Sequence, residues 1–471
     1  MPAVADVAVL GAGFAGLACA TALAEAGARV RVLEASGSLG GRGGSFCEPR
    51  TGEALDLGPH LLVGANHSVL ALLERLGTRG RLIFQRSLAI EYRWPGGRRA
   101  HLRCARLPAP LHLVAGLLRF HPLSLAERAA ALRVGRAARS LIHRPASIAS
   151  SAPEASANSS APRADETVSG WLGRLRQSSR ARRLLWEPLA VAALNDSPDR
   201  SAASLFARVL AEMFSGRASQ SVLGWPDGTL AELVEPAARW LAEHDGRLTR
   251  SRPVVGIEFE GARVRSVRLR GGERVEAGHY VSALPARSLE RLLGSAPPEL
   301  APLRAVCQRF AGRTSPILSA YLWCSRPCLG TPFCALPEGP FPWIFERRAR
   351  ACIGSPRWIL ALTLSGARGW MERSDAAILE IARTQVERHF PGTSVCLEHA
   401  RVVRQPVATF EPAPDLCSAR PGPASPAANL WLAGDWTDTG LPSTLEGACR
   451  SGHTAADAVL AAGWARTQRR D

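Results

Sequence analysis

The chain opens with two short, continuous apolar runs. Val4–Leu10 is valine-rich and stops at Gly11, and Arg29–Leu33 is a second run of the same kind. Between them, Phe14–Ala26 has helical character and ends at Gly27. Parallel strands that are buried on both faces give continuous apolar runs rather than alternating ones. The pattern therefore predicts a parallel strand–helix–strand unit at the start of the chain.

The pattern changes several times in the middle of the chain. Residues 82–102 look extended around a Pro-Gly-Gly turn, whereas 111–142 is an amphipathic helical stretch rich in leucine and arginine. Residues 168–214 are helical again. From 247 to 284, β-branched and charged residues alternate, which is typical of an antiparallel excursion.

The last part of the chain contains further strand and helix patterns. Strands are predicted at Pro316–Trp323 and Trp358–Leu364, followed by a helix over Ser374–Phe390. Asn429–Ala433 is a last buried strand, and a helix is predicted from Ser443 to Ala462.

These segments predict an α/β protein of two interleaved domains. One is a Rossmann-like dinucleotide-binding domain, a parallel sheet with an antiparallel excursion, and the other is a mixed α+β substrate domain. The expected boundaries are 1–81, 220–290 and 426–471 for the first domain, and 82–219 and 291–425 for the second. Residues 144–164, mostly Ser, Ala and Pro, predict a mobile surface loop within the second domain.

Composition narrows the classes of partner. The net charge of +17 comes from arginine alone, because the sequence contains no lysine. No zinc-finger spacing, RNA-binding aromatic motif or basic heptad accompanies this charge, so a nucleic-acid partner is not expected. No segment offers the ~20 uninterrupted apolar residues of a membrane-spanning helix. The composition therefore indicates a globular protein.

The cysteines indicate neither a disulfide framework nor a metal site. Eleven of them are spread from Cys19 to Cys449, which favours a reducing, cytoplasmic location. Cys324, Cys328 and Cys334 form a cluster, but they lack the paired spacing of a structural zinc site. We expect no metal.

A glycine motif sits between the first strand and the first helix. Gly11 would make the tight turn, Gly13 would let the backbone reach a pyrophosphate, and Gly16 would allow close packing. Glu34 ends the second strand, where its carboxylate can accept hydrogen bonds from ribose hydroxyls. The motif predicts a dinucleotide on the helix N-terminus.

Two further segments point to the same cofactor. Gly40-Gly41-Arg42 follows Glu34 after a short loop, and near the other end of the chain a buried strand runs into Gly434-Asp435. The helix that begins at about Thr444 and Leu445 would direct its positive N-terminus toward the electron-rich edge of a flavin.

These motifs resemble the flavin-dependent amine oxidase and phytoene desaturase superfamily, in which the arginine of the GGR segment lies near FAD. Three stretches, Asp56–Ala65, Trp186–Asn195 and Gly434–Thr444, are similar to the squalene-associated FAD-dependent desaturases, the hydroxysqualene dehydroxylases. The resemblance implies FAD as cofactor. It places Arg42 near the flavin and Asp435 at the ribityl chain. The expected FAD contacts are Gly11, Gly13, Gly16, Glu34, Gly41, Arg42, Gly58, Val255, Gly434, Asp435, Thr444 and Leu445.

Several functions stay open at this point. The resemblance implies reductive dehydroxylation of hydroxysqualene to squalene, whereas the Gly58-Pro59-His60 form looks more like carotenoid desaturases. Amine oxidases of this type place an aromatic residue where this chain has Thr444 and Leu445, and many use a lysine that this chain lacks. A non-catalytic flavoprotein and a basic membrane-surface adaptor are alternatives from a different class.

His60 and Asp438 are the candidate catalytic residues, because their motifs flank the expected flavin site. The expected partners are an isoprenoid lipid substrate and an external electron donor or reductase, since no second nucleotide-binding motif is present. The stretch Leu107–Phe120 combines apolar residues with arginines, which predicts peripheral contact with an anionic membrane at the inner face of the cell membrane.

Overall fold

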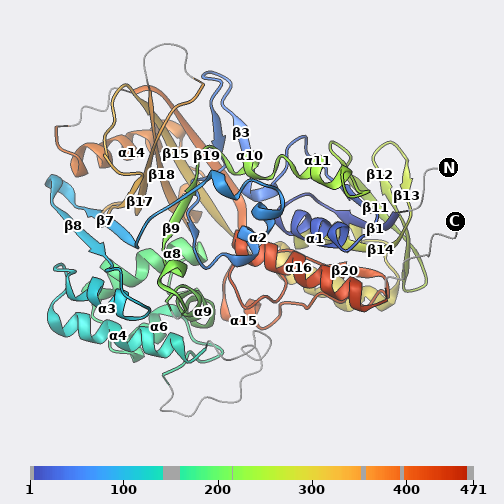
Figure 1. Ribbon diagram of the computed structural model, residues 1–471, viewed down its shortest axis with the longest axis horizontal. Coiled ribbons are helices and arrows are strands. Elements are labelled where there is room, and N and C mark those ends of the chain that lie inside the picture. Colours follow the sequence, from blue (N-terminus) through green and yellow to red (C-terminus); the bar gives the residue numbers. More distant parts are fainter. Residues whose placement is uncertain (1–4, 142–159, 215, 352–356, 393–396, 464–471) are drawn as a thin grey trace.

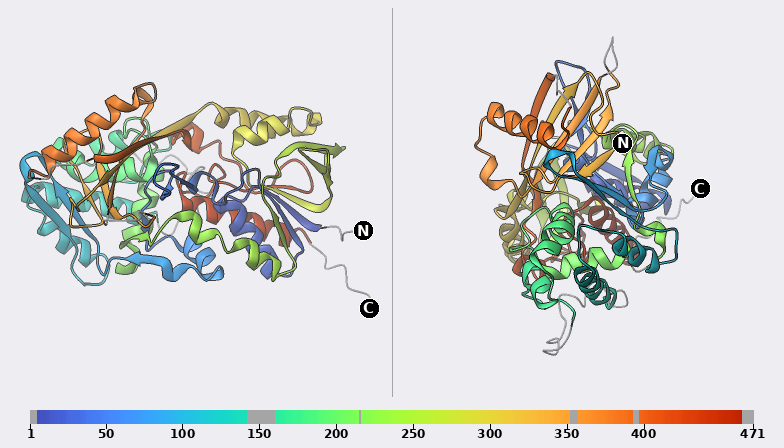
Figure 2. Two further views of the ribbon diagram at one scale, coloured as in Figure 1. Left: turned by 90° about the horizontal axis from the view of Figure 1, so that it is seen from above. Right: turned by 90° about the vertical axis from the view of Figure 1, so that its left-hand side faces the viewer.

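The computed structural model describes residues 5–141, 160–214, 216–351, 357–392 and 397–463 (Figure 1). Two large sheets lie toward opposite ends of an elongated molecule, and the described chain begins and ends beside the first of them (Figure 2). Most of the predicted surface loop, up to residue 159, falls outside the described residues.

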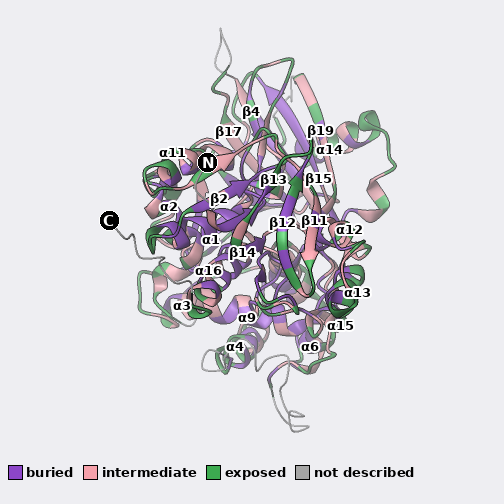
Figure 3. Ribbon diagram, turned by 90° about the vertical axis from the view of Figure 1, so that its right-hand side faces the viewer, coloured by how far each residue is buried: buried purple, intermediate pink, exposed green. Residues whose placement is uncertain are grey.

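The first sheet has five parallel strands in the order β10-β2-β1-β14-β20. Their bounds in that order are Arg247–Thr249, Val30–Leu33, Ala5–Leu10, Ala277–Ser282 and Leu430–Leu432. The central strand β1 is buried along Val7–Leu10, as a parallel strand covered on both faces must be. Its neighbour β2 is also mostly buried (Figure 3). This confirms the predicted parallel strand–helix–strand unit.

Helices cover one face of this sheet. They are α1 (Phe14–Glu25), α2 (His67–Arg75), α11 (Ala237–Ala242) and α16 (Leu445–Ala461). The α1 and α16 helices approach so closely that a Cβ on Gly452 would lie 2.2 Å from the carbonyl oxygen of Ala15. That approach requires glycine, because no real Cβ contact is so short.

An antiparallel meander covers the other face, as the alternating pattern predicted. Its strands are β11 (Val254–Glu260), β12 (Arg263–Leu269) and β13 (Arg274–Val275). Helices α12 (Ala286–Leu292) and α13 (Ala301–Ala311) complete this layer, in one apolar core with the sheet.

The second sheet is mixed and has seven strands in the order β19-β15-β18-β17-β16-β7-β8. Their bounds in that order are Leu397–Phe410, Thr314–Cys324, Trp358–Ser365, Trp343–Arg348, Phe333–Ala335, Ala89–Arg93 and Arg99–Arg103. All pairs are antiparallel except β16 with β7. Sequence patterns predicted β15 and β18 but missed β16, β17 and the long β19. In β19, arginines and a glutamate interrupt the apolar alternation.

The two faces of β15 have different neighbours, because successive side chains of a strand point to opposite faces. Leu318 and Leu322 pack against α14 (Asp375–His389). Tyr321 and Trp323 face the other way and pack with Leu55. Leu55 lies on β4 (Ala54–Asp56), which pairs with β3 (Ser45–Cys47) in the segment that follows the GGR motif.

A group of helices closes the lower end of the second sheet. They are α3 (Leu111–Leu118), α4 (Leu125–Arg139), α6 (Val168–Arg174), α7 (Ser179–Ala181), α8 (Glu187–Leu194) and α9 (Ala203–Phe214). The helical pattern predicted over 111–142 is confirmed for most of its described part, but it forms two helices rather than one. The chain leaves the helix after Leu118, and Ser124 and Glu127 form a capping box that begins α4.

A small sheet and two short helices connect these parts. The sheet runs β5-β9-β6, with bounds Leu62–Val63, Leu223–Pro226 and Leu82–Phe84. The helices are α10 (Leu230–Val234) and α15 (Pro414–Cys417). Over the described residues, no helix combines the length and the apolar character needed to cross a bilayer.

Two helical glycines offer a matched test of the α1–α16 contact. Gly452→Ala should lower the free energy of unfolding by about 1–3 kcal/mol, because the two helices must separate. Gly135 lies in α4, where an added Cβ would meet no atom within 4 Å, so Gly135→Ala should raise it by about 0.5–1 kcal/mol. Urea denaturation measures both, and effects of the same sign would contradict the packing argument.

Candidate functional site

The glycine turn after β1 has the geometry that a nucleotide-binding turn needs. Gly11 adopts a φ of +99°, and its N–H donates to the carbonyl of Leu33 at 2.8 Å. A Cβ on Gly16 would lie 2.0 Å from the carbonyl oxygen of Gly11. The helix therefore starts in direct contact with the turn only because Gly16 has no side chain.

The N-terminus of α1 is open to a ligand. Gly13 is the N-cap residue, and no side chain caps the helix. Phe14, Ala15 and Gly16 are buried, and no side chain of the N-cap residue satisfies the N–H groups of this first turn. A Cβ on Gly13 would have no protein atom closer than 3.9 Å. Uncapped buried donors beside an open position fit a pyrophosphate.

Glu34 lies where the sequence predicted, at the end of β2. Its carboxylate oxygens accept the N–H groups of Ala12 at 2.6 Å and Ser36 at 2.7 Å. These bonds hold the carboxylate beside the glycine turn. Each oxygen has a further lone pair, so the predicted ribose contact is compatible with this arrangement.

The GGR segment lies against the glycine turn. Gly40 donates its N–H to the carbonyl of Ala12 at 3.0 Å and forms a bridge with Gly13. A Cβ on Gly41 would lie 3.2 Å from the Cα of Gly13. A Cβ on Gly43 would lie 2.8 Å from Leu445, at the start of α16. The three motifs predicted from separate parts of the sequence are therefore neighbours in the fold.

An ion pair joins the GGR segment to the C-terminal motif. Arg42 pairs with the carboxylate of Asp435, which also accepts a hydrogen bond from Ser443, and Arg42 donates to the carbonyl of Ala408 at 3.2 Å. Asp435 is 6% exposed. Burial by itself would raise the pKa of Asp435, but the charge of Arg42 and the hydrogen bonds from Arg42 and Ser443 hold that pKa below its usual value. A charged carboxylate is therefore kept in the interior.

The helix that follows begins as predicted. Thr444 caps α16 by accepting the N–H of Gly447 at 3.1 Å, and Leu445 is the first helical residue. Gly434, at the end of β20, adopts a φ of +135° and donates its N–H to Ser451 at 2.8 Å. The strand end and the helix start are thereby fixed to each other.

Sequence analysis missed a buried arginine that shapes this loop. Arg420 donates to the carbonyls of Leu441 at 2.6 Å, Asp435 at 2.9 Å and Thr437. Burial lowers the pKa of Arg420. Among so many arginines, no local signal marks this one.

Two buried acids near the predicted motifs also have positioning roles. Glu446 accepts the N–H groups of Ser68 and Val69, and so caps α2. Asp56 accepts the N–H of Leu230, at the start of α10, at 2.9 Å. Burial raises the pKa of Asp56 to about 6, against opposing hydrogen bonds. Both acids lie in or beside the motifs that carried the family resemblance, but only tertiary partners reveal their roles.

The segment that contains Gly58 and His60 lies against the second sheet. Tyr321 donates its hydroxyl to the carbonyl of Asp56 at 2.7 Å, and a Cβ on Gly58 would lie 3.4 Å from Ser319. Burial lowers the pKa of His60 to about 4. Its ring has no hydrogen-bond partner among the described residues. His60 is therefore a neutral imidazole at neutral pH.

The remaining predicted residues, Asp438 and Val255, lie in separate places. The carboxylate of Asp438 accepts the N–H of Gly440 at 3.2 Å, within the loop that Arg420 holds. Val255 lies at a bulge of β11 and is 39% exposed. The nearby Arg252 donates its N–H to the carbonyl of Glu34 at 2.8 Å, so β11 begins beside the predicted ribose site.

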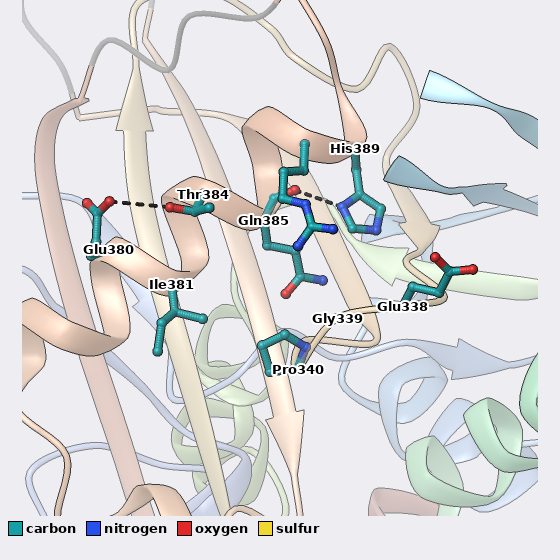
Figure 4. A pocket seen from close by; sticks show the side chains of 9 residues that line it. Glu338, Gly339, Pro340, Glu380, Ile381, Thr384, Gln385 and His389 are labelled. Carbon is teal, nitrogen blue, oxygen red and sulfur yellow. Dashed lines mark hydrogen bonds between the residues drawn. The ribbon is translucent and has the colours of Figure 1, made fainter. Parts of the chain in front are cut away.

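The pocket of about 190 Å³ in Figure 4 is a different place. It lies between α14 and the loop around Glu338 to Pro340, and none of the predicted FAD residues lines it. Gln385 closes its floor through two hydrogen bonds with the backbone of Phe341. In the described part of the chain, no group of three or more His, Cys, Asp or Glu side chains is arranged to hold a metal ion.

Substitutions at two glycines should distinguish an effect on cofactor binding from an effect on folding stability. Gly13→Val should lower the free energy of unfolding of the flavin-free protein by less than about 1 kcal/mol, because a Cβ there would make only ordinary contacts, none closer than 3.9 Å. It should weaken binding of the dinucleotide at least about a hundredfold. Gly16→Ala should instead lower stability by about 1–3 kcal/mol. Denaturation and flavin titration check this, and a Gly13→Val protein that binds flavin normally would contradict the site.

Known proteins are similar to this chain along nearly its whole length. The family model for flavin-containing amine oxidoreductases matches residues 14–460. Hydroxysqualene dehydroxylase of Rhodopseudomonas palustris is 30% identical, over 97% of this chain and 98% of that protein. The 15-cis-phytoene desaturase of Synechococcus elongatus is 25% identical, over 97% of this chain and 96% of that protein.

Solved structures agree on the fold. A putrescine oxidase bound to putrescine superposes with a TM-score of 0.71 at 18% identity, covering 98% of this chain and 99% of that one. The open helix N-terminus, the glycine turn and the buried Asp435 fit the FAD that this family binds. The chain belongs to the flavin-containing amine oxidoreductase family and is an FAD-dependent oxidoreductase.

Proposed function

We propose that the protein reduces hydroxysqualene to squalene by replacing an allylic hydroxyl with hydrogen. The observation that carries this proposal is the 30% identity to a hydroxysqualene dehydroxylase over 97% of the chain. The overall change is R–OH plus a proton and a hydride, giving R–H and water. FAD in its reduced form supplies the hydride. The remaining requirements are to exclude water, stabilise positive charge at carbon and assist loss of the hydroxyl.

Several aromatic rings gather in the apolar core that Leu61 packs against. Phe333 is 6.0 Å from Trp225, 6.2 Å from Phe345 and 6.4 Å from Trp343, measured between ring centroids. Leu61, which directly follows His60, packs against the same apolar core. Aromatic faces attract positive charge, and an apolar surface excludes water that would recapture a cation. These features support a substrate that ionises to an allylic cation.

His60 suits a hydrogen-bonding role in this reaction. Because burial lowers its pKa to about 4, the ring is neutral at neutral pH and offers one N–H donor and one acceptor. We propose that His60 orients the departing hydroxyl rather than transferring a proton as an imidazolium. Asp438 remains the second candidate, in the loop that follows Asp435.

Desaturation of a carotenoid precursor is the second candidate. The identity to a phytoene desaturase and the Gly58-Pro59-His60 sequence favour it. It would use the same fold in the oxidising direction, removing hydride from carbon instead of delivering it. In the reductive direction, we propose that an external reductase supplies the electrons.

Anaerobic incubation with isotope label tests the reaction. The protein is reduced in deuterated buffer, mixed rapidly with hydroxysqualene, and the lipids are analysed by mass spectrometry. We expect squalene that carries one deuterium, because the hydride comes from the reduced cofactor. Oxidised protein without a reductant is the control and should give no squalene.

Other products would overturn the proposal. Unlabelled squalene, with exchange of the label into buffer excluded, would rule out direct hydride delivery. Conversion of phytoene or squalene to a more unsaturated product would favour the desaturase.

The protonation of His60 gives a pH prediction. Its folded-state pKa of about 4 lies below the ordinary value of 6.5, so the unfolded chain binds a proton more readily between these values. Stability should therefore fall as the pH is lowered from 6.5 to 4, and His60→Gln should reduce that dependence. Urea denaturation across this range measures it. An NMR titration of the His60 ring with a midpoint near 6.5 would contradict the assignment.

A further inference from the structure

Exposed leucines gather on two neighbouring helices. Seven large apolar side chains of the described residues are exposed, and five of them lie between residues 107 and 132. The five are Leu107 (43% exposed), Leu111 (55%), Leu118 (56%), Leu125 (72%) and Leu132 (40%). Single exposed leucines are ordinary, but such a concentration marks an interaction surface. We call these five residues the leucine surface.

The fold holds these leucines outward. Leu111 and Leu118 are seven residues apart on α3, and Leu125 and Leu132 are seven apart on α4, so each pair shares one helix face. The opposite faces are fixed in the core, through Leu113 and Leu117 of α3 and buried alanines and Val134 of α4. The exposed leucines therefore do not belong to the hydrophobic core.

The junction between the two helices is also fixed. Arg128 donates to the carbonyl of Leu118 at 2.6 Å and to that of Leu123 at 2.8 Å. The capping box of Ser124 and Glu127 determines where α4 begins. Figures 1 and 2 show α3 and α4 together at the end of the molecule away from the five-stranded sheet.

The charge around the leucine surface is positive. Exposed arginines surround it at positions 103, 106, 119, 133, 136 and 139. Their guanidinium groups form no hydrogen bond or ion pair within the described residues. Glu127 is the one acid between residues 99 and 141, and its carboxylate is engaged by Ser124 and Ser178. Apolar side chains ringed by uncompensated arginines complement an anionic lipid surface.

We propose that α3 and α4 dock the protein on an anionic phospholipid bilayer. The leucines of the leucine surface enter the head-group region, and the surrounding arginines bind lipid phosphates. A second copy of the chain is a poorer occupant, because it would bring two arginine-rich surfaces of the same charge together. The purpose of the docking rests on the proposed function, since a C30 isoprenoid is held in membranes, but the binding itself does not.

Vesicle sedimentation of the FAD-bound protein tests this surface. We expect the wild-type protein to sediment with vesicles of equal parts phosphatidylcholine and phosphatidylglycerol, and much less with phosphatidylcholine alone. The combined change Leu118→Ser and Leu125→Ser should weaken binding about tenfold or more. Replacing Arg133 or Arg136 with alanine should weaken it about fivefold for each charge, with loss of binding at high salt.

Ile83→Ser is the matched control, because Ile83 is 46% exposed on β6, outside the leucine surface. It should bind vesicles like the wild-type protein. All variants should keep their FAD, which visible absorbance measures. Because sedimentation needs no substrate, a failure of the dehydroxylation assay leaves this test intact.

Three results would overturn the proposal. The first is wild-type protein that stays in the supernatant with anionic vesicles. The second is equal binding by the leucine variants and the Ile83→Ser control. The third is a wild-type dimer in sedimentation velocity that becomes monomeric on Leu118→Ser and Leu125→Ser without any vesicle binding, which would assign the surface to a second copy of the chain.

Discussion

The ion pair between Arg42 and the buried Asp435 joins parts of the chain that are 393 residues apart. A lone carboxylate at this depth would carry a large desolvation cost, so its partner must be present for the fold to form around it. Ser443 and the backbone bonds of Arg420 complete the arrangement. The GGR segment, the end of β20 and the start of α16 are thereby held in one place, beside the glycine turn of the candidate flavin site.

Close backbone contacts hold the helices in place against the first sheet. Gly16 lets α1 begin on the glycine turn, and Gly452 lets α16 lie against α1. Both helices start at the edge of the sheet where β1 and β20 end, because parallel strands present their carboxyl ends at one edge. The positive ends of two helices therefore point into the same region, which favours an electron-rich and anionic cofactor.

The second sheet packs against the segment that leads to His60. The β15 strand carries α14 on one face and presents Ser319, Tyr321 and Trp323 to the other, against the segment that leads to His60. That segment is a continuation of the GGR motif, so the cofactor site and the second sheet are linked by a short length of chain. Burial there keeps His60 neutral, and the aromatic cluster around Phe333 extends the apolar surroundings. The fold thus places the segment that follows the GGR motif beside an apolar, aromatic core.

The amino-acid sequence alone determined those elements that depend on residues close together in the chain. Continuous apolar runs specified β1 and β2, and glycine spacing specified the turn at Gly11 to Gly16, because backbone conformation and two-sided burial leave a signal within a few residues. Tertiary structure alone decided β19, which pairs with β15 although its own sequence is rich in charge. It also decided that Arg420 binds the Asp435 loop, that Glu446 caps α2 and that burial lowers the pKa of His60. Each of these depends on partners distant in sequence, and burial and hydrogen bonding with such partners have no local signature.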